Sequence, residues 1–391
     1  MSEAYIVGAA RTPIGRFLGA LAALPAPELG AIAIRAALER AAVPAEAVED
    51  VLFGNVVQAG VGQAPARQAM LRAGIPASAS AMTLNKVCAS GLQAVADAAR
   101  AIRLGEADVI VAGGMESMSQ APHLARIRQG VRSGSLELQD ANIHDGLWCA
   151  FEHHLMGNAA EAIARKHGIT RAMQDEFALE SHRRAVAAQR EGCFRAEIVP
   201  VPVQRGKERF VVEADEGPRP DTSLEKLAAL RPAFEEGGTV TAGNAPGMSD
   251  GAAALVVASE AAVARYGLRP LARVLGAASA ATEPLWLFEA PPLAVRKLLD
   301  RTGLRLDDFD LLEVNEAFAA QIVANSREMG WDRARLNIHG GAVALGHPLG
   351  ATGARILVTL LHALRQHGGR RGLAALCHGG GGAVALAVEV V

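Results

Sequence analysis

The sequence predicts an α/β fold in which helices cover both faces of the sheet. Short apolar segments alternate with helical segments along most of the chain, which is the pattern of a helix-covered sheet. The apolar segments are hydrophobic throughout, as in residues 109–112, so we expect both faces of each strand to be buried. The order of the segments also repeats once. Two similar α/β halves should therefore pack against each other and place their loops in a shared cleft.

The first half is predicted between residues 4 and 114. Its first helix carries apolar residues at helical spacing and stops before Pro44. In chain order we expect strands at 4–7, 51–56, 81–84 and 108–114, and helices at 27–42, 65–73 and 92–104.

The character of the sequence changes between residues 115 and 242. The segment 126–139 is polar with little periodicity. Helices are predicted at 159–167 and 171–189, and the second is charged and resembles a surface helix. Short strands and prolines follow at 199–221. We interpret this stretch as an excursion that carries binding loops, or as a solvated insert without a chemical role.

Sheet character returns at residue 252. The turn at 88–91 before one helix matches the turn at 350–353 before another, and residues 50–55 match residues 310–315. The strand and glycines at 109–114 likewise match 373–381. We expect strands at 252–258, 271–278, 309–314, 372–377 and 383–390, and helices at 293–301, 317–327 and 354–367.

Composition limits the function classes. Half of the 391 residues are hydrophobic but only 4% are aromatic, so the core must consist mainly of Ala, Val, Leu and Ile. The length suggests two or three domains. A net charge of −2 gives no reason to expect a nucleic-acid or membrane surface. No apolar run reaches the roughly 18 residues of a membrane span, and no leader segment is apparent.

The four cysteines, Cys88, Cys149, Cys193 and Cys377, are far apart in the sequence. No Cys-x-x-Cys or Cys/His ligand spacing is present, so neither a structural zinc site nor a disulfide framework is expected. We therefore predict a cytoplasmic protein with reduced thiols and no metal site.

Cys88 is the first candidate for chemistry. It follows the strand at 81–84 and stands at the entrance of the helix at 92–104. The free N–H groups and partial positive charge of a helix N-terminus stabilise a thiolate, so we expect Cys88 to ionise easily and to be nucleophilic. The alternative is a buried, inert cysteine that fills a gap between helix and strand.

Three turns of the second half carry further reactive side chains. Asn315 follows a strand, His347 precedes a glycine-rich helix entrance, and Cys377 ends a buried strand before glycines. A cysteine nucleophile needs a base, and histidine titrates nearest neutral pH. A second cysteine can carry a proton to or from carbon, and the glycine N–H groups can form an oxyanion hole. Taken singly, these residues could also be a helix cap, a turn residue and a packed thiol.

Five segments resemble the signatures of the thiolase family: Asn85 to Leu92, Ala112 to Ser119, Asn315 to Gln321, Gly340 to Arg355, and Cys377 to Gly381. The resemblance runs from Arg11 to the C-terminus, and motifs in this order and spacing are highly specific. It implies the thiolase fold, in which two similar βαβαβαββ halves pack as a five-layer α-β-α-β-α sandwich with an inserted loop domain.

The resemblance also implies three domains. Residues 1–118 plus 243–268 would form the N-terminal half with the nucleophile. Residues 119–242 would form the loop domain, which holds coenzyme A and ties subunits into tetramers in many relatives. Residues 269–391 would form the C-terminal half with the histidine and the second cysteine.

Roles for individual residues follow from the resemblance as well. Cys88 takes up an acyl group as a thioester, and His347 activates it. His347 also polarises the thioester oxygen of the second substrate with a water held by Asn315. Cys377 removes or returns the proton on the α-carbon, and the N–H groups of Cys88 and Gly379 form a second oxyanion hole. The implied reaction condenses two acetyl-CoA to acetoacetyl-CoA, or cleaves a 3-ketoacyl-CoA with CoA.

The resemblance places a further group of residues against coenzyme A: Leu147, Met156, Arg219, Phe234, Ala242, Met248, Ala317 and Phe318. Coenzyme A and acyl-CoA are substrates in this interpretation, no cofactor stays bound, and no nucleic acid or membrane is involved. The expected assembly is a homotetramer.

Several positions depart from the family pattern. Pro246 stands where a serine commonly touches the pantetheine arm, and Leu155 replaces a frequent histidine. His378 stands where a branched aliphatic residue is usual, and residues 287–291 differ from the usual glycine-rich loop near the acyl end. The acyl-chain preference therefore stays open, and a degradative thiolase for longer chains is an alternative to an acetoacetyl-CoA enzyme.

Two other functions are weighed against thiolase activity. A decarboxylating ketoacyl synthase shares the fold but uses a Cys-His-His or Cys-His-Asn set, so the motif around Cys377 argues against it. A non-catalytic thiolase-like protein that binds CoA or lipid would be expected to lose the nucleophile or the base, and here both are present.

Overall fold

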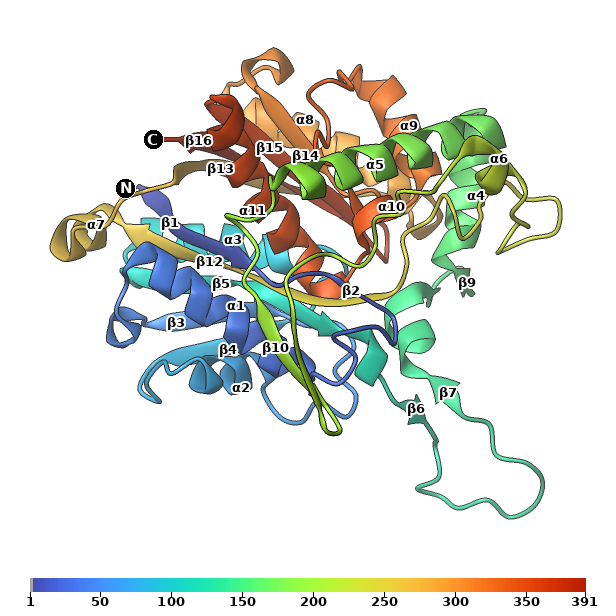
Figure 1. Cartoon of the computed structure of the whole chain (residues 1–391), viewed down its shortest axis with the longest axis horizontal. Helices are drawn as coiled ribbons and strands as arrows, with labels where there is room; N and C mark the ends of the chain where they lie inside the picture. Colours follow the sequence, from blue (N-terminus) through green and yellow to red (C-terminus); the bar gives the residue numbers. More distant parts are fainter. Residues whose placement is uncertain (1–2) are drawn as a thin grey trace.

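The computed structural model describes residues 3–391 (Figure 1). Each repeat forms one sheet, and the two sheets are joined at one edge, where β1 (Ala4–Arg11) pairs with β13 (Ala272–Ala281). The strands of the first half lie in the spatial order β1, β12 (Ser249–Ser259), β5 (Val109–Ser117), β3 (Asp50–Gly54) and β4 (Ser80–Leu84). Those of the second half lie in the order β13, β16 (Gly382–Val390), β15 (Arg371–His378) and β14 (Leu311–Val314). Only two residue pairs between β1 and β13 join the sheets.

Six helices complete the layers. Helices α1 (Ala26–Ala41) and α2 (Pro65–Arg72) pack on the outer face of the first sheet, and α8 (Ala290–Thr302) and α9 (Ala319–Met329) pack outside the second. Helices α3 (Ser90–Leu104) and α11 (Leu349–His367) lie between the sheets and contact each other as well as strands. The predicted α-β-α-β-α sandwich is confirmed.

Close backbone contact holds the central layer against the first sheet. A Cβ atom added to Gly114 of β5 would lie 1.9 Å from the carbonyl oxygen of Gly350 in α11. One added to Gly353 would lie 2.4 Å from the main-chain nitrogen of Leu92 in α3. Only glycine permits this approach, because any side chain would push the layers apart. The turns at the N-terminal ends of α3 and α11 are thereby brought next to each other.

The second repeat is less regular than the first. Where the first half has β4 beside β3, the second has only an isolated bridge between Leu312 and Leu336. Several predicted boundaries also shift. The largest differences are that β1 continues to Arg11 and that α11 begins at Leu349 instead of residue 354, and α3 and α9 begin at Ser90 and Ala319.

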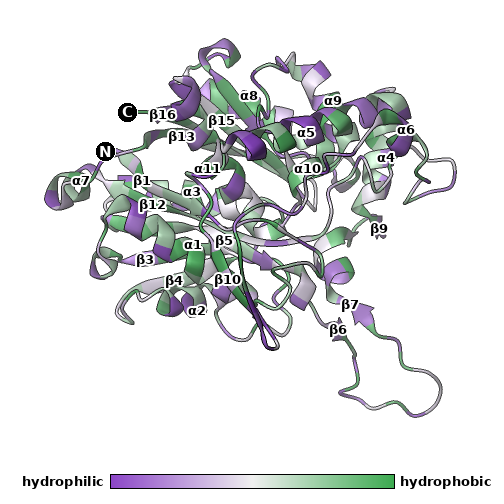
Figure 2. Cartoon of the chain, viewed as in Figure 1, coloured by the Kyte–Doolittle hydropathy of each residue, from purple (hydrophilic) through white to green (hydrophobic). Residues whose placement is uncertain are grey.

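The excursion of residues 119–242 lies largely beside the sandwich, on the right of the view in Figure 1, and α5 and β10 cross in front of it. Its helices are α4 (Met156–Lys166), α5 (Arg171–Glu191) and α6 (Leu224–Ala228), and its short strands are β6 (His123–Leu124), β7 (Gln139–Asp140), β8 (Trp148–Cys149), β9 (His154–Leu155), β10 (Val201–Arg205) and β11 (Glu208–Val212). The segment between β6 and β7 protrudes from the molecule and carries hydrophobic as well as hydrophilic residues (Figure 2). Helix α5 buries one face against α6, α9 and the short α10 (Ala342–Leu345), whereas Glu176 and Arg183 on its other face are exposed.

The remaining elements are small. They are β2 (Gly15–Arg16), which pairs with β12, and α7 (Glu260–Tyr266), together with single turns of 3₁₀ or π-helix. None of the helices within residues 3–391 has the length and apolar character needed to cross a membrane.

Candidate active site

Cys88 lies in a strained turn between β4 and α3. The preceding Val87 has φ of 47°, a left-handed conformation that β-branched residues rarely adopt. Asn85 Oδ1 accepts a hydrogen bond from the Val87 N–H at 2.9 Å. Ser90 Oγ accepts from the Lys86 N–H at 2.8 Å and donates to the Val87 carbonyl at 2.6 Å. These bonds stabilise the strained turn and thereby fix the direction of the Cys88 side chain.

His347 is buried immediately before α11, and its surroundings determine its tautomer. Ring Nδ1 lies 2.7 Å from Thr352 Oγ1, and the same hydroxyl lies 2.8 Å from the carbonyl oxygen of Pro348. A carbonyl can only accept, so the single hydroxyl hydrogen goes to Pro348 and Nδ1 carries the hydrogen that Thr352 accepts. Nε2 is then unprotonated, and it finds no hydrogen-bond partner within residues 3–391.

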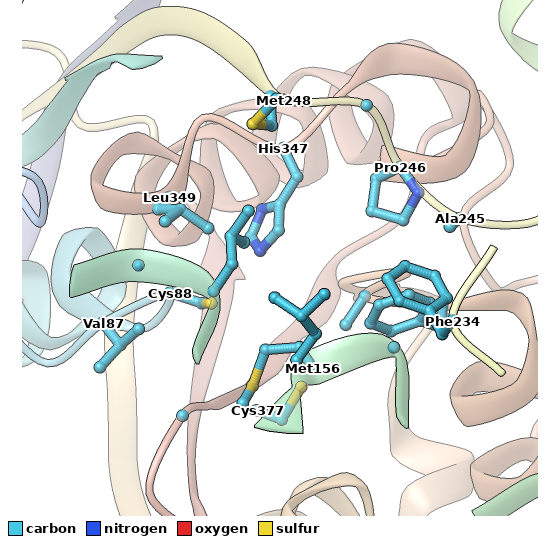
Figure 3. Close-up of a pocket in the computed structure, with 18 of the residues that line it drawn as sticks. Val87, Cys88, Met156, Phe234, Ala245, Pro246, Met248, His347, Leu349 and Cys377 are labelled. Atoms are coloured by element: carbon cyan, nitrogen blue, oxygen red, sulfur yellow. The ribbon is translucent and has the colours of Figure 1, made fainter. Parts of the chain in front are cut away.

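Three side chains from different segments point into one cavity of about 330 Å³ (Figure 3). Cys88 comes from the turn before α3, His347 from the turn before α11, and Cys377 from the end of β15. The main-chain N–H groups of Cys88 and Gly379 both face the Cys88 sulfur, and they lower the pKa of its thiol. The cavity therefore combines a sulfur, a free imidazole nitrogen, a second sulfur and two main-chain donors.

Burial nevertheless dominates the ionisation of this site. It raises the pKa of Cys88 to about 12, although the two N–H groups act in the opposite direction. The expectation of an easily ionised thiol is therefore wrong: the N-cap of α3 is Ala89, and burial disfavours the thiolate more than the helix start favours it. Burial and then the charge of Arg355 lower the pKa of His347 to about 3. Thiol and imidazole are both neutral at pH 7.

Asn315 differs from the other predicted site residues because it does not line the cavity. Its main-chain N–H donates to the Ala375 carbonyl at 2.9 Å. Both polar atoms of its buried side chain lack a protein partner within residues 3–391. It is not the helix cap that its position suggested, because the N-cap of α9 is Phe318. A pair of buried, unpartnered amide atoms is suited to holding an ordered water.

Seven of the eight predicted coenzyme A contacts line the same cavity. They are Leu147, Met156, Phe234, Ala242, Met248, Ala317 and Phe318. The positions that depart from the family pattern are also in its wall, namely Leu155, Pro246, Leu287, Phe288 and His378. The wall away from the reactive groups is therefore mainly apolar.

The eighth predicted contact, Arg219, lies in an adjoining cavity of about 220 Å³. The two cavities share Ala242, Ala245, Gly247 and Met248. Arg16 and His182 also line the second cavity, and the Arg219 N–H donates to His182 Nδ1 at 3.2 Å. Burial and the neighbouring guanidinium groups lower the pKa of His182 to about 4, so the positive charge of this cavity comes from the two arginines.

Arg16 and His182 were missed by sequence reasoning. Arg16 follows the segment Arg11 to Gly15, where the family resemblance begins, so its position offered a signal. His182 lies within a charged helix, and its sequence neighbours gave no indication that it faces a cavity.

No group of three or more His, Cys, Asp or Glu side chains within residues 3–391 is arranged to hold an ion, and the four cysteines are free. The chemistry of the cavity is that of thiols, imidazole and main-chain donors.

Comparison with known sequences decides the family. Residues 4–261 match the family described as Thiolase, N-terminal domain, and residues 268–390 match Thiolase, C-terminal domain. The chain belongs to the thiolase family. The family predicted from the five sequence segments is thus confirmed.

Relatives that match this thiolase over their full length carry the name acetyl-CoA acetyltransferase. It is 51% identical to an acetyl-CoA acetyltransferase of Escherichia coli (strain K12) over 391 residues, covering 100% of this chain and 99% of that protein. It is also 51% identical to an acetyl-CoA acetyltransferase of Cupriavidus necator, with both proteins covered completely. A crystal structure of the Bacillus anthracis acetyl-CoA acetyltransferase superimposes with a TM-score of 0.98 at 42% identity, over 100% of this chain and 99% of that one.

Proposed function

We propose that this thiolase is an acetyl-CoA C-acetyltransferase that condenses two acetyl-CoA to acetoacetyl-CoA and catalyses the reverse thiolysis. The main support is the convergence of Cys88, His347, Cys377 and the Gly379 N–H on one cavity. The names of the full-length relatives support the same activity. They do not favour the longer-chain degradative alternative.

In the first half-reaction, the sulfur of Cys88 attacks the carbonyl carbon of acetyl-CoA. Because the thiol is neutral, its proton must leave during the attack, and the unprotonated Nε2 of His347 takes it. The N–H groups of Cys88 and Gly379 stabilise the oxyanion. The C–S bond to CoA then breaks, and the CoA thiolate takes the proton of Cys377. The products are an acetyl thioester on Cys88, free CoA, a Cys377 thiolate and a protonated His347.

In the second half-reaction, the Cys377 thiolate removes a proton from the methyl carbon of a second acetyl-CoA. Protonated His347 and a water on Asn315 stabilise the enolate oxygen that develops. The carbanion attacks the acetyl group on Cys88, a C–C bond forms, and the C–S bond to Cys88 breaks. Cys88 takes back the proton from His347, so all three groups return to their starting states.

Coenzyme A extends from the reactive cavity into the adjoining cavity. The apolar wall with Met156, Phe234 and Phe318 accommodates the pantetheine arm, and Pro246 offers no side-chain hydrogen bond to it. Arg16 and Arg219 face the phosphate-bearing end in the second cavity. CoA enters and leaves as a substrate, and no cofactor stays bound.

Acetylation of Cys88 tests this proposal directly. The protein is incubated with acetyl-CoA, digested and analysed by mass spectrometry, with Cys88→Ala as control. We expect one acetyl group on the Cys88 peptide and none in the variant. Active protein without this modification would overturn the mechanism, and tight CoA binding without turnover of acetoacetyl-CoA would favour a non-catalytic role.

Substrate range separates the remaining enzyme alternatives. Thiolysis rates across a series of 3-ketoacyl-CoA should peak at acetoacetyl-CoA and fall steeply for longer chains. A broad or longer optimum would indicate a degradative thiolase, and activity with malonyl thioesters alone would indicate a ketoacyl synthase.

The assembly proposed is a cytoplasmic homotetramer. The segment between β6 and β7 exposes Ile127, Val131, Leu136 and Leu138 far from the sandwich, and exposed apolar groups of this kind are typical of contacts between subunits (Figure 2). Analytical ultracentrifugation of the full chain should give the mass of four subunits, and Leu138→Glu should lower it. An unchanged tetramer in that variant would exclude this segment as the contact.

A further inference from the structure

Glu116 is a buried carboxylate that the proposed reaction does not use. It is the penultimate residue of β5 and is completely inaccessible to solvent. Oε1 accepts hydrogen bonds from Asn55 Nδ2 at 2.8 Å and from the Val57 N–H at 3.1 Å. Oε2 accepts from the Gly350 N–H at 2.8 Å and the Val56 N–H at 3.1 Å. Every donor thus comes from an amide, and none comes from a basic side chain.

The four donors match the hydrogen-bonding capacity of an ionised carboxylate, which is acceptor-only. Burial raises the pKa of Glu116 to about 7, and the hydrogen bonds from Gly350, Val56, Val57 and Asn55 act against that rise. A protonated or amidated side chain would direct a hydrogen or an NH₂ group at one of these donors. The environment is therefore built for two acceptor oxygens at this point.

One branch of these contacts reaches the general base. Gly350 is the second residue of α11, whose first N–H groups have no partner within the helix. Thr352, two residues further on, holds the ring of His347 through Nδ1. Because the helix start is fixed by Glu116 from the opposite half, the position of the His347 ring depends on that carboxylate.

The other branch reaches the nucleophile. The carbonyl oxygen of Val56, whose N–H is bound by Glu116, accepts a hydrogen bond from Asn85 Nδ2 at 3.3 Å. Asn85 in turn accepts from the N–H of Val87 and so supports the strained turn before Cys88. The two branches end at the two groups that must exchange a proton.

We propose that Glu116 is a positioning residue that sets the relative placement of Cys88 and His347 by binding the loop at 55–57 and the start of α11 together. It touches neither substrate nor the reacting atoms. This inference rests on the proposed function, because the proton transfer it aligns is the first step of that reaction.

The test is a kinetic comparison of wild type with Glu116→Gln. The amide keeps the size of the side chain but turns one acceptor into a donor that faces an N–H group. A displacement of the base by about 1 Å is enough to lower kcat by about 100-fold. We expect that loss in kcat for acetoacetyl-CoA thiolysis, an equal slowing of single-turnover acetylation of Cys88, and KM values within about twofold of wild type.

A control at an exposed carboxylate is Asp310→Asn. Asp310 also accepts two main-chain N–H bonds, from Arg370 and Arg371, but at the far end of β14. We expect a lower Tm with kcat within about twofold, as for any purely structural carboxylate. A Glu116→Gln protein with the same pattern, a lower Tm and unchanged kcat, would overturn the inference.

A variant that does not fold and a wild type that lacks activity are distinguished as follows. If Glu116→Gln does not fold, Glu116→Asp replaces it, because it keeps the charge and displaces the oxygens; a kcat about tenfold below wild type is expected, and an unchanged kcat would refute the inference. If wild type itself lacks thiolysis, the proposed function fails, and that result is distinct from failure of the positioning role.

Discussion

The ends of β5 and β15 are equivalent points of the two repeats, yet they carry different chemistry. The pairing of β3 with β5 and of β14 with β15 places Glu116 in the position of Cys377 and Asn55 in that of Asn315. In the first half, Asn55 donates to Glu116. In the second, both polar atoms of Asn315 lack a partner among residues 3–391, and Cys377 faces the cavity.

This difference shows how one backbone can serve as a structural joint and as a reactive site. At the end of β5, hydrogen-bond acceptors and donors match around Glu116, and this part of the structure binds the two halves together. Where a buried amide is left without a partner, the structure loses about 1–3 kcal/mol, and the group stays available to a water or substrate. Four experiments test the comparison, beginning with the largest expected effect.

Replacing the second-half sulfur should separate the two half-reactions. In Cys377→Ala, kcat for condensation should fall by about 10³-fold or more, because no group takes the α-proton. Acetylation of Cys88 should still occur, at a reduced rate, and mass spectrometry measures it. Cys193→Ala, which removes a cysteine outside the cavity, is the control and should keep its activity. Equal activity in both variants would contradict the role of Cys377.

The two asparagines should respond differently to truncation. Asn315→Ala is expected to lower kcat by about 10²-fold with little change in Tm, because it removes the water that supports an oxyanion. Asn55→Ala should mainly lower the free energy of unfolding, by about 1–3 kcal/mol, with kcat falling less than about tenfold. Thiolysis kinetics and chemical denaturation measure these effects. If both variants lost the same amount of kcat and of stability, the distinction between the ends of β5 and β15 would be contradicted.

The ionisation of the Cys88 thiol can be measured by its rate of alkylation. Because burial raises the pKa of Cys88 to about 12, the thiolate fraction should increase about tenfold per pH unit throughout the neutral range. The rate of inactivation by iodoacetamide should therefore rise without a plateau between about pH 6 and pH 9. A plateau near pH 7 would contradict alkylation through a small thiolate fraction; the same profile in His347→Ala, which lacks the base, would mean that the thiol is already ionised there.

The smallest effect is expected in the second cavity. Arg219→Ala should raise KM for CoA about tenfold and leave kcat unchanged, because it removes one charge-assisted contact with a phosphate. Arg209→Ala, on the exposed strand β11, is the matched control and should change neither value. An unchanged KM in Arg219→Ala would place the phosphates elsewhere.

Much of the architecture was predictable because local signals agree with the fold. Continuous apolar strands such as β5 and helices with a repeating apolar face specify buried sheet layers, and the repeat of the turn at 88–91 in that at 350–353 indicated two halves. The ionisation of Cys88 was predicted wrongly for a physical reason. A helix start can be recognised in a sequence, whereas the desolvation that outweighs it depends on segments hundreds of residues away.

By itself, the sequence determined the order of strands and helices, the two-half architecture and the family, because these depend on residue periodicity and on motifs that are contiguous along the chain. Only the tertiary structure decided that Cys88 and His347 are neutral, that the Asn315 side chain has no partner in the described part of the chain and that Glu116 links both turns. Each of those properties arises from burial and from hydrogen bonds between segments far apart in the chain, and neither is encoded in any local stretch of residues.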